Sequence, residues 1–205
     1  MHNIHGRRRV NRPPQHRAWS APLFAAVAVA VAACGSSTGV DTIANPDDPT
    51  EAELFDFLDQ DVRNPSAFDI LGASPVRLDS NTRWDFIFQI RQDGRAQLRP
   101  RGVIIGVNTT DAGLIELTVP FDEVQSAPAG GYERLRAITI EEGDVLAMQS
   151  QRDANLEPVR CRRYGKLEVL SIDQAAGTVM FRHLINPNCE NRNLVPGAAV
   201  PIEDQ

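Results

Sequence analysis

Short apolar runs alternate with turn signals through most of the chain after residue 65. The runs are rich in Val, Ile, Leu and Phe, and dipeptides such as Asp93-Gly94 and Glu142-Gly143 separate them. Even spacing of this kind is typical of an antiparallel β-sandwich or a partly open barrel, so we expect an all-β fold. The predicted strands are residues 67–72, 76–79, 84–91, 95–99, 102–107, 114–119, 134–140, 144–151, 162–172 and 178–186.

Two of these strands alternate clearly between apolar and polar positions. In one, four large apolar side chains share a face: Trp84, Phe86, Phe88 and Ile90. In the last strand, the shared face carries Val179, Phe181, His183 and Ile185. Successive side chains of a strand point to opposite faces, so each strand should bury one face in the core. By the same rule, Lys166 and Glu168 should lie on the outward face of their strand.

The chain before the strands has a helical pattern. Residues 50–53 match a capping box, and four apolar residues follow it: Leu54, Phe55, Phe57 and Leu58. This pattern predicts one short helix over residues 50–60, which Asn64-Pro65 terminates. Residues 34–49 are rich in Gly, Ser, Asp and Pro and predict a flexible tether. A single all-β domain is therefore expected over residues 50–205.

An apolar stretch of a different kind lies near the N-terminus. Residues 21–33 carry no charge and follow a segment with five arginines and no acidic residue. The stretch is too short to span a bilayer and is typical of a signal peptide. It ends in Val31-Ala32-Ala33-Cys34, which resembles a bacterial lipobox. We therefore expect residues 1–33 to be a lipoprotein signal peptide and Cys34 to be acylated. The alternative is an ordinary secretory leader in which Cys34 has no role.

Removal of the leader makes the chain strongly acidic. Residues 1–33 hold five of the 21 basic residues and none of the 27 acidic ones, so the net charge moves from −6 to −11. A chain this acidic is a poor candidate for binding nucleic acid or anionic lipid headgroups. The membrane partner should therefore be engaged through the acyl chains on Cys34. Gly35 follows the cysteine, and the absence of Asp at that position favours the outer membrane.

The last two predicted strands form a hairpin centred on residue 175, so the numbers of paired residues sum to about 350. This register predicts three pairs: Leu167 with His183, Val169 with Phe181, and Ile172 with Thr178. It also places Cys161 opposite Cys189, within the Cα separation that a disulfide requires. Export to an oxidising compartment favours the bond. We therefore expect Cys161 and Cys189 to form a disulfide.

Several segments, taken in order, resemble the HmuY-like family of envelope-anchored lipoproteins. The matching segments are Trp84-Asp85-Phe86-Ile87-Phe88, residues 121–128, Gly131-Tyr132, Gly143-Asp144-Val145, residues 164–171 and residues 179–182. The resemblance covers roughly residues 80–194. It implies an all-β sandwich-like fold and, from the best-known members, capture of haem through paired histidine or methionine ligands. The chain after residue 33 offers three such donors: His183, Met148 and Met180.

None of these three donors lies in a segment that matches a family ligand, and each also fits a packing role in the core. The sequence contains no nucleophile elbow, phosphate loop or zinc ligand set, so we expect no enzyme and no metal site. Two functions remain. The first is a ligand-binding lipoprotein that passes haem or another tetrapyrrole to an outer-membrane transporter. The second is a structural or interaction lipoprotein that binds another envelope protein.

Overall fold

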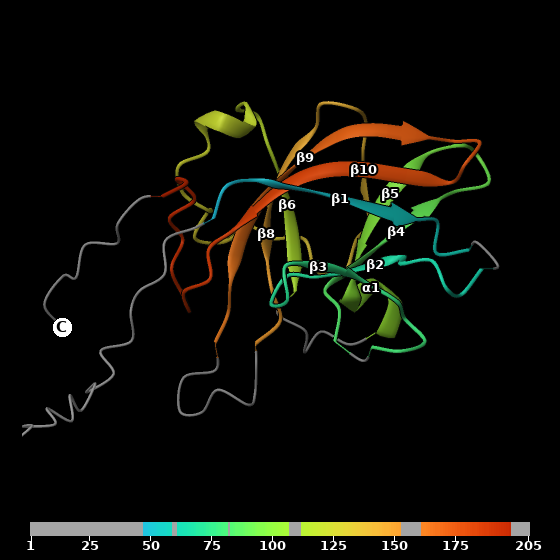
Figure 1. The fold of residues 1–205 in the computed structure, drawn as a ribbon, viewed down its shortest axis with the longest axis horizontal. Coiled ribbons are helices and arrows are strands. Elements are labelled where there is room, and N and C mark those ends of the chain that lie inside the picture. Colours follow the sequence, from blue (N-terminus) through green and yellow to red (C-terminus); the bar gives the residue numbers. More distant parts are fainter. Residues whose placement is uncertain (1–46, 59–60, 82, 107–111, 153–160, 198–205) are drawn as a thin grey trace, which may run out of the picture. The chain divides into compact units, whose positions relative to one another are not determined.

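The computed structural model describes residues 47–58, 61–81, 83–106, 112–152 and 161–197 (Figure 1). Within these residues the strands form two antiparallel sheets of five strands each, which confirms an all-β sandwich. Sheet A has the order β1 (Thr50–Phe55), β10 (Thr178–Ile185), β9 (Tyr164–Asp173), β8 (Val145–Gln149) and β6 (Gly113–Leu117). Sheet B has the order β3 (Ser74–Val76), β2 (Ala67–Asp69), β4 (Phe86–Ile90), β5 (Ala96–Pro100) and β7 (Ile138–Thr139).

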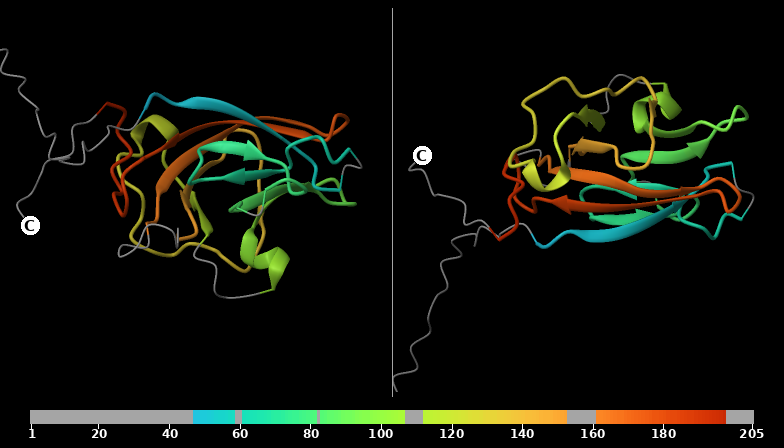
Figure 2. Two further views of the ribbon diagram at one scale, coloured as in Figure 1. Left: turned by 60° about the horizontal axis from the view of Figure 1, so that its bottom comes forward. Right: turned by 90° about the horizontal axis from the view of Figure 1, so that it is seen from above.

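The main core fills the space between the two sheets, which Figure 2 shows from two further directions. Phe68 of β2 stacks on Phe86 of β4 with 5.4 Å between ring centroids. It also meets Phe181 of β10 edge to face, again at 5.4 Å. All three rings are fully buried. Burial of such a side chain stabilises the fold by about 1.5–3 kcal/mol, so these rings contribute strongly to holding sheet A against sheet B.

Part of the outer face of sheet A is buried as well. The segment that begins with η1 (Phe121–Glu123) and the chain after β10 cover that face. The resulting second cluster consists of Phe121, Val124, Ala127, Tyr132, Val145, Ala147, Tyr164, Leu184 and Leu194. Lys166 points to this face, as expected, but it is only 2% exposed. At Lys166, facing outward from β9 therefore does not mean exposure to solvent.

The outer face of sheet B is covered only in part. Trp84, Ala67 and Ile87 form a third cluster there, and Ile104 of α1 (Arg101–Ile105) packs against it. The expectation that Trp84 shares the face of Phe86 was wrong, because β4 begins only at Phe86 and the chain before it turns away from the main core. The rest of this face, over β5 and β7, lies outside the third cluster.

The predicted helix over residues 50–60 is wrong, because residues 50–55 form strand β1. Glu51 and Glu53 are exposed whereas Ala52 and Leu54 are buried, which is the period of a strand. β1 pairs with β10 along its whole length. The capping-box match was local, and pairing with a strand distant in sequence outweighs it. Residues 47–49, the described end of the predicted tether, are exposed and lie outside any strand.

Three other predicted strands also differ. Residues 101–105 form α1, a single helical turn that ends at Gly106 with φ 69°, where a strand over 102–107 was expected. The strand expected over 134–140 is limited to Ile138–Thr139. The strand expected over 76–79 is instead β3, Ser74–Val76. In α1 only Gly102 is buried, so its apolar residues do not supply the buried face that a sandwich strand needs.

The hairpin register is confirmed at its open end. His183 pairs with Leu167 and Phe181 pairs with Val169. Near the turn the register moves by one residue, so Ile172 pairs with Val179 and not with Thr178, because a bulge lies between Met180 and Phe181. The predicted disulfide is present, with 4.9 Å between the Cα atoms of Cys161 and Cys189. Cys161 precedes β9 and Cys189 follows β10, so the disulfide links the two chain segments at the open end of the hairpin.

The disulfide should contribute substantially to stability. It spans 28 residues, and on the chain-entropy model such a crosslink is worth about 3–4 kcal/mol. We expect the Cys161→Ser/Cys189→Ser protein to lose that much free energy of unfolding, measured by urea denaturation. Cys34→Ala serves as the control for loss of a cysteine as such. An equal unfolding midpoint in the double variant and the wild type would contradict this prediction.

Candidate functional site

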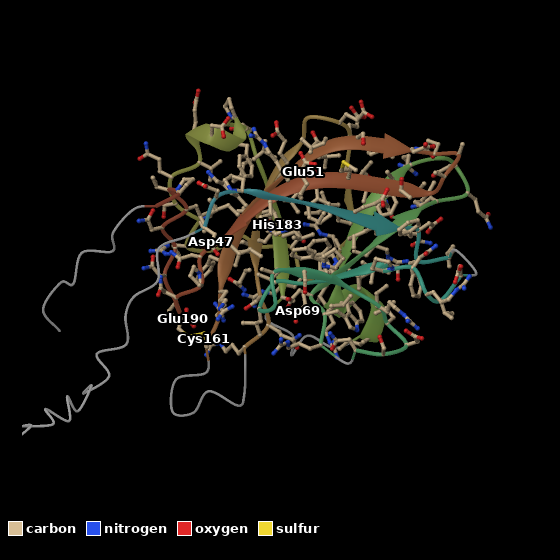
Figure 3. The ribbon with its side chains drawn as sticks, in the orientation of Figure 1. Asp47, Glu51, Asp69, Cys161, His183 and Glu190 are labelled. Carbon is tan, nitrogen blue, oxygen red and sulfur yellow. A yellow bond between two sulfur atoms is a disulfide. The ribbon has the colours of Figure 1, made fainter. Side chains whose placement is uncertain are left out.

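His183 lies inside the sandwich, and Figure 3 shows it between the ribbons of β10 and β2. It is 4% exposed, and its ring centroid is 4.9 Å from that of Phe68 and 5.9 Å from that of Phe181. Its Nε2 lies 3.2 Å from the Thr50 hydroxyl, and its Nδ1 is buried without a hydrogen-bond partner. Burial lowers the pKa of His183 to about 4. This is the environment of a neutral packing histidine.

The two methionines lie elsewhere. Met148 of β8 is fully buried in the main core. It shares the inner face of sheet A with His183, but β9 runs between β8 and β10. Met180 is 37% exposed and occupies the opposite face of β10 from His183. The three donors therefore do not meet around one ligand in this structure.

Asp85 is a buried carboxylate that the sequence pattern does not single out. It is 1% exposed. Its Oδ2 accepts a hydrogen bond from the Ile70 backbone N–H and its Oδ1 accepts one from the Gln151 N–H, both at 2.7 Å. Burial raises the pKa of Asp85 to about 7, against the lowering effect of these two hydrogen bonds. The carboxylate joins sheet B to the chain that follows β8, so its role is structural.

Lys166 is a second buried charge with a structural role. Its Nζ donates hydrogen bonds to the carbonyl oxygens of Phe121 and Val124, both at 2.9 Å. The same nitrogen lies 4.5 Å from the centroid of the Phe121 ring. Burial lowers the pKa of Lys166. These contacts attach the covering segment to the outer face of sheet A.

A groove crosses the part of sheet B that the third cluster leaves uncovered, and we call it the sheet B groove. It consists of three hollows of about 500, 480 and 380 Å³. The first and second share Arg136 and Ala137, and the second and third share Gln89 and Arg91, so the hollows adjoin. The groove runs from the β6 and β7 edges over β5 to the turn between β4 and β5.

The middle hollow is lined almost wholly by polar side chains. Gln89 pairs with Gln97 on the neighbouring strand, and Gln97 pairs with Thr139 of β7, so the three form a row across the sheet. The Gln97 amide donates to the Thr139 hydroxyl at 3.3 Å, and the Arg99 guanidinium donates to the Gln89 amide oxygen. With Arg91 and Arg136, three arginines line this hollow, and none of the described residues that line it is a carboxylate. Asp93 and Glu133 of the adjoining hollows pair with Arg91 and Arg136. In an acidic chain, such a concentration of positive charge is suited to an anion.

The sequence pattern did not identify these groove residues. Arg and Gln on an exposed strand face are common and carry no motif. The available signal was weak: Gln89 with Arg91, and Gln97 with Arg99, repeat the same two residue types at alternate positions of two neighbouring strands. Only the pairing of β4 with β5 places these residues side by side.

Within the described residues, no three His, Cys, Asp or Glu side chains lie close enough together to hold a metal ion. No helix in the described part of the chain is long and apolar enough to cross a membrane. Cys34 and the lipobox lie outside the described residues.

Comparisons with known proteins found no relative. No family model matches the chain, and neither a curated protein nor a solved structure matches it. The resemblance to HmuY-like lipoproteins therefore stays a prediction. Function has to be argued from the sheet B groove and from the sequence at the N-terminus.

The buried His183 should make stability depend on pH. Its pKa is about 4 in the folded protein and 6.5 ordinarily, so the unfolded chain binds more protons between these values and stability falls as pH falls. Between pH 7 and 4.5 we expect a loss of about 2 kcal/mol from this residue. Asp85, with its raised pKa, acts in the opposite direction, so the loss is measured as the difference between wild type and His183→Gln in urea denaturation.

Met180→Leu provides the matched control for this measurement. Met180 lies on the same strand but is partly exposed and does not titrate. The Met180→Leu protein should therefore keep the pH dependence of the wild type. An unchanged pH dependence in His183→Gln would show that this histidine is not held neutral by the fold.

Proposed function

We propose that the protein is a lipid-anchored envelope protein without catalytic activity that binds an anionic ligand in the sheet B groove. The observation that carries this proposal is the middle hollow, whose described lining holds Arg91, Arg99 and Arg136 and no carboxylate. Arg91 and Arg136 pair with Asp93 and Glu133 in the adjoining hollows, so Arg99 is the arginine without a counterion among the described residues. The net charge of −11 after loss of the leader makes that concentration of positive charge stand out. A binding protein needs a surface of this kind, whereas an enzyme also needs a nucleophile or an acid–base pair within reach of the ligand.

The anchor is argued from the lipobox-like segment that ends at Cys34. Several acyl chains on one cysteine hold a protein at a membrane even when its charge is unfavourable. Residues 47–49 are exposed and lead directly into β1, so the anchored end enters the domain at an edge strand of sheet A. The groove lies mainly on sheet B, with β6 of sheet A at one end, and no residue of β1 lines it.

Tetrapyrrole capture remains a proposal that rests only on the family resemblance. A haem iron with two protein ligands needs donors that face each other across one pocket. His183 and Met148 lie in the closed core and Met180 on another face, so the described structure offers no support for this use of them. Transfer to an outer-membrane transporter rests on the same resemblance.

The anchor is tested by metabolic labelling with a radioactive fatty acid. Wild-type protein should carry the label and Cys34→Ala should not, because the acylated thiol is absent. Ser36→Ala, a neighbouring change that keeps the cysteine, should be labelled as strongly as the wild type. Equal labelling of Cys34→Ala would end the lipoprotein proposal.

The binding surface is tested by nuclear magnetic resonance on ¹⁵N-labelled Cys34→Ala protein. We expect a polymer fraction prepared from the cell envelope to shift backbone and arginine side-chain signals of β4, β5 and β7. Signals of β1 and β10, on the other sheet, should stay unchanged and serve as the internal reference. Shifts confined to sheet A, or no shift at all, would contradict the assignment of the groove.

A further inference from the structure

We infer that the ligand of the sheet B groove is an extended polysaccharide that carries carboxylate groups, with one carboxylate bound at Arg99. This inference rests on the proposed function, because it names the chemistry of the ligand in the same groove. It depends on three observations: the state of the Arg99 guanidinium, the fixed amides beside it, and the direction in which the groove runs.

Arg99 carries the central charge and has no counterion among the described residues. Its only polar side-chain partner within the described residues is the neutral amide of Gln89. Its Nε is buried and has no hydrogen-bond partner there. A guanidinium presents its N–H groups as a planar fork that matches a carboxylate, and a buried donor without a partner is costly. A carboxylate that enters the middle hollow would supply the counterion that the guanidinium lacks.

The neighbouring amides are held in place to accept further polar groups. Gln97 is 9% exposed yet lines the hollow, and its amide is fixed by the bond to the Thr139 hydroxyl. Gln89 is held by Arg99. Amides and guanidinium groups fixed in one row form hydrogen bonds to hydroxyls and carboxylates without a large loss of side-chain entropy on binding. The hydroxyl groups of a sugar ring suit such a row.

The arginines at the two ends extend the positive charge along the groove. The Nε of Arg91 lies 3.5 Å from the Oδ1 of Asp93, and Arg136 forms an ion pair with Glu133. Their side chains are 48% and 78% exposed. Exposed pairs of this kind contribute little to stability, so both arginines are free to exchange their carboxylates for those of a ligand. A chain with repeated negative charges therefore meets three cations in succession.

The direction of the groove distinguishes a polysaccharide from a peptide. The row from Gln89 to Thr139 runs across the strands, over the face of the sheet. The backbone groups of β4 and β5 along this row are used in the ladder between them, so an occupant meets side chains only. A peptide bound there would leave its own amide groups without a ladder partner, whereas a sugar chain has none to satisfy.

The test is a calorimetric titration of the full-length protein in detergent with an oligogalacturonate, a short chain of carboxylated sugars. We expect binding that weakens with added salt, because the contacts are charged. The same oligosaccharide with its carboxylates methyl-esterified should bind at least about tenfold more weakly, as expected for loss of a charged hydrogen bond. Equal binding of the esterified chain would overturn the inference, as would tighter binding of polyglutamate, which would identify an acidic peptide as the ligand.

The variants locate the site. Arg99→Gln should weaken oligogalacturonate binding by roughly 10- to 100-fold. Arg63→Gln is the matched control, because Arg63 is an exposed arginine that pairs with Asp61, and neither residue lines the groove; its affinity should stay within about twofold. If Arg99→Gln does not fold, the exposed Arg136→Gln takes its place, with a loss of several-fold expected. Equal affinity of the Arg99 or Arg136 variant and the wild type would overturn the inference.

Failure of this inference is distinguishable from failure of the proposed function. If oligogalacturonate does not bind but the envelope polymer fraction still shifts the signals of β4, β5 and β7, the chemistry of the ligand is wrong and the groove is right. If oligogalacturonate does not bind and the envelope fraction does not shift the signals of β4, β5 and β7, both the inference and the proposed binding surface are wrong.

Discussion

One buried carboxylate ties the two sheets together at one end of the sandwich. The carboxylate of Asp85 accepts hydrogen bonds from the backbone N–H groups of Ile70 and Gln151. Ile70 follows β2 of sheet B, and Gln151 follows β8 of sheet A. Its own backbone N–H donates to Phe68, and its carbonyl accepts the N–H of Arg101. A buried N–H left without an acceptor costs about 1–3 kcal/mol, so no apolar side chain could replace this one at equal stability.

The two sheets differ in how their outer faces are covered. Sheet A is covered on its inner face and, around β8, on its outer face as well, so every residue of β8 is buried. Under the covering segment, the charge of Lys166 becomes part of the structure by bonding two carbonyl groups, whereas Glu51 and Glu53 of β1 stay exposed. Among the described residues, the cluster on the outer face of sheet B is centred on Ala67, Trp84 and Ile87. The polar row on β4, β5 and β7 lies outside that cluster and lines the sheet B groove.

The sequence predicted the structure best where the fold follows from alternation along one strand or from the register of one hairpin. The alternation of Phe86 and Phe88, the hairpin register at His183 and the disulfide between Cys161 and Cys189 were all predicted correctly. Helical and strand patterns were confused in residues 50–55 and 101–105, because pairing with β10 or exposure to solvent decided the outcome. The groove could not be predicted, because its residues come from separate strands and become neighbours only in the folded sheet.

The position of β1 has a mechanical consequence. If the chain is held at Cys34, any pull on a bound polymer passes from the groove in sheet B to sheet A and leaves the domain through β1. This strand pairs with β10 over six residues, so a pull along its axis must break the hydrogen bonds of the whole ladder together, whereas a pull across it breaks them one after another. The domain should therefore resist load along the direction of β1 better than load across it.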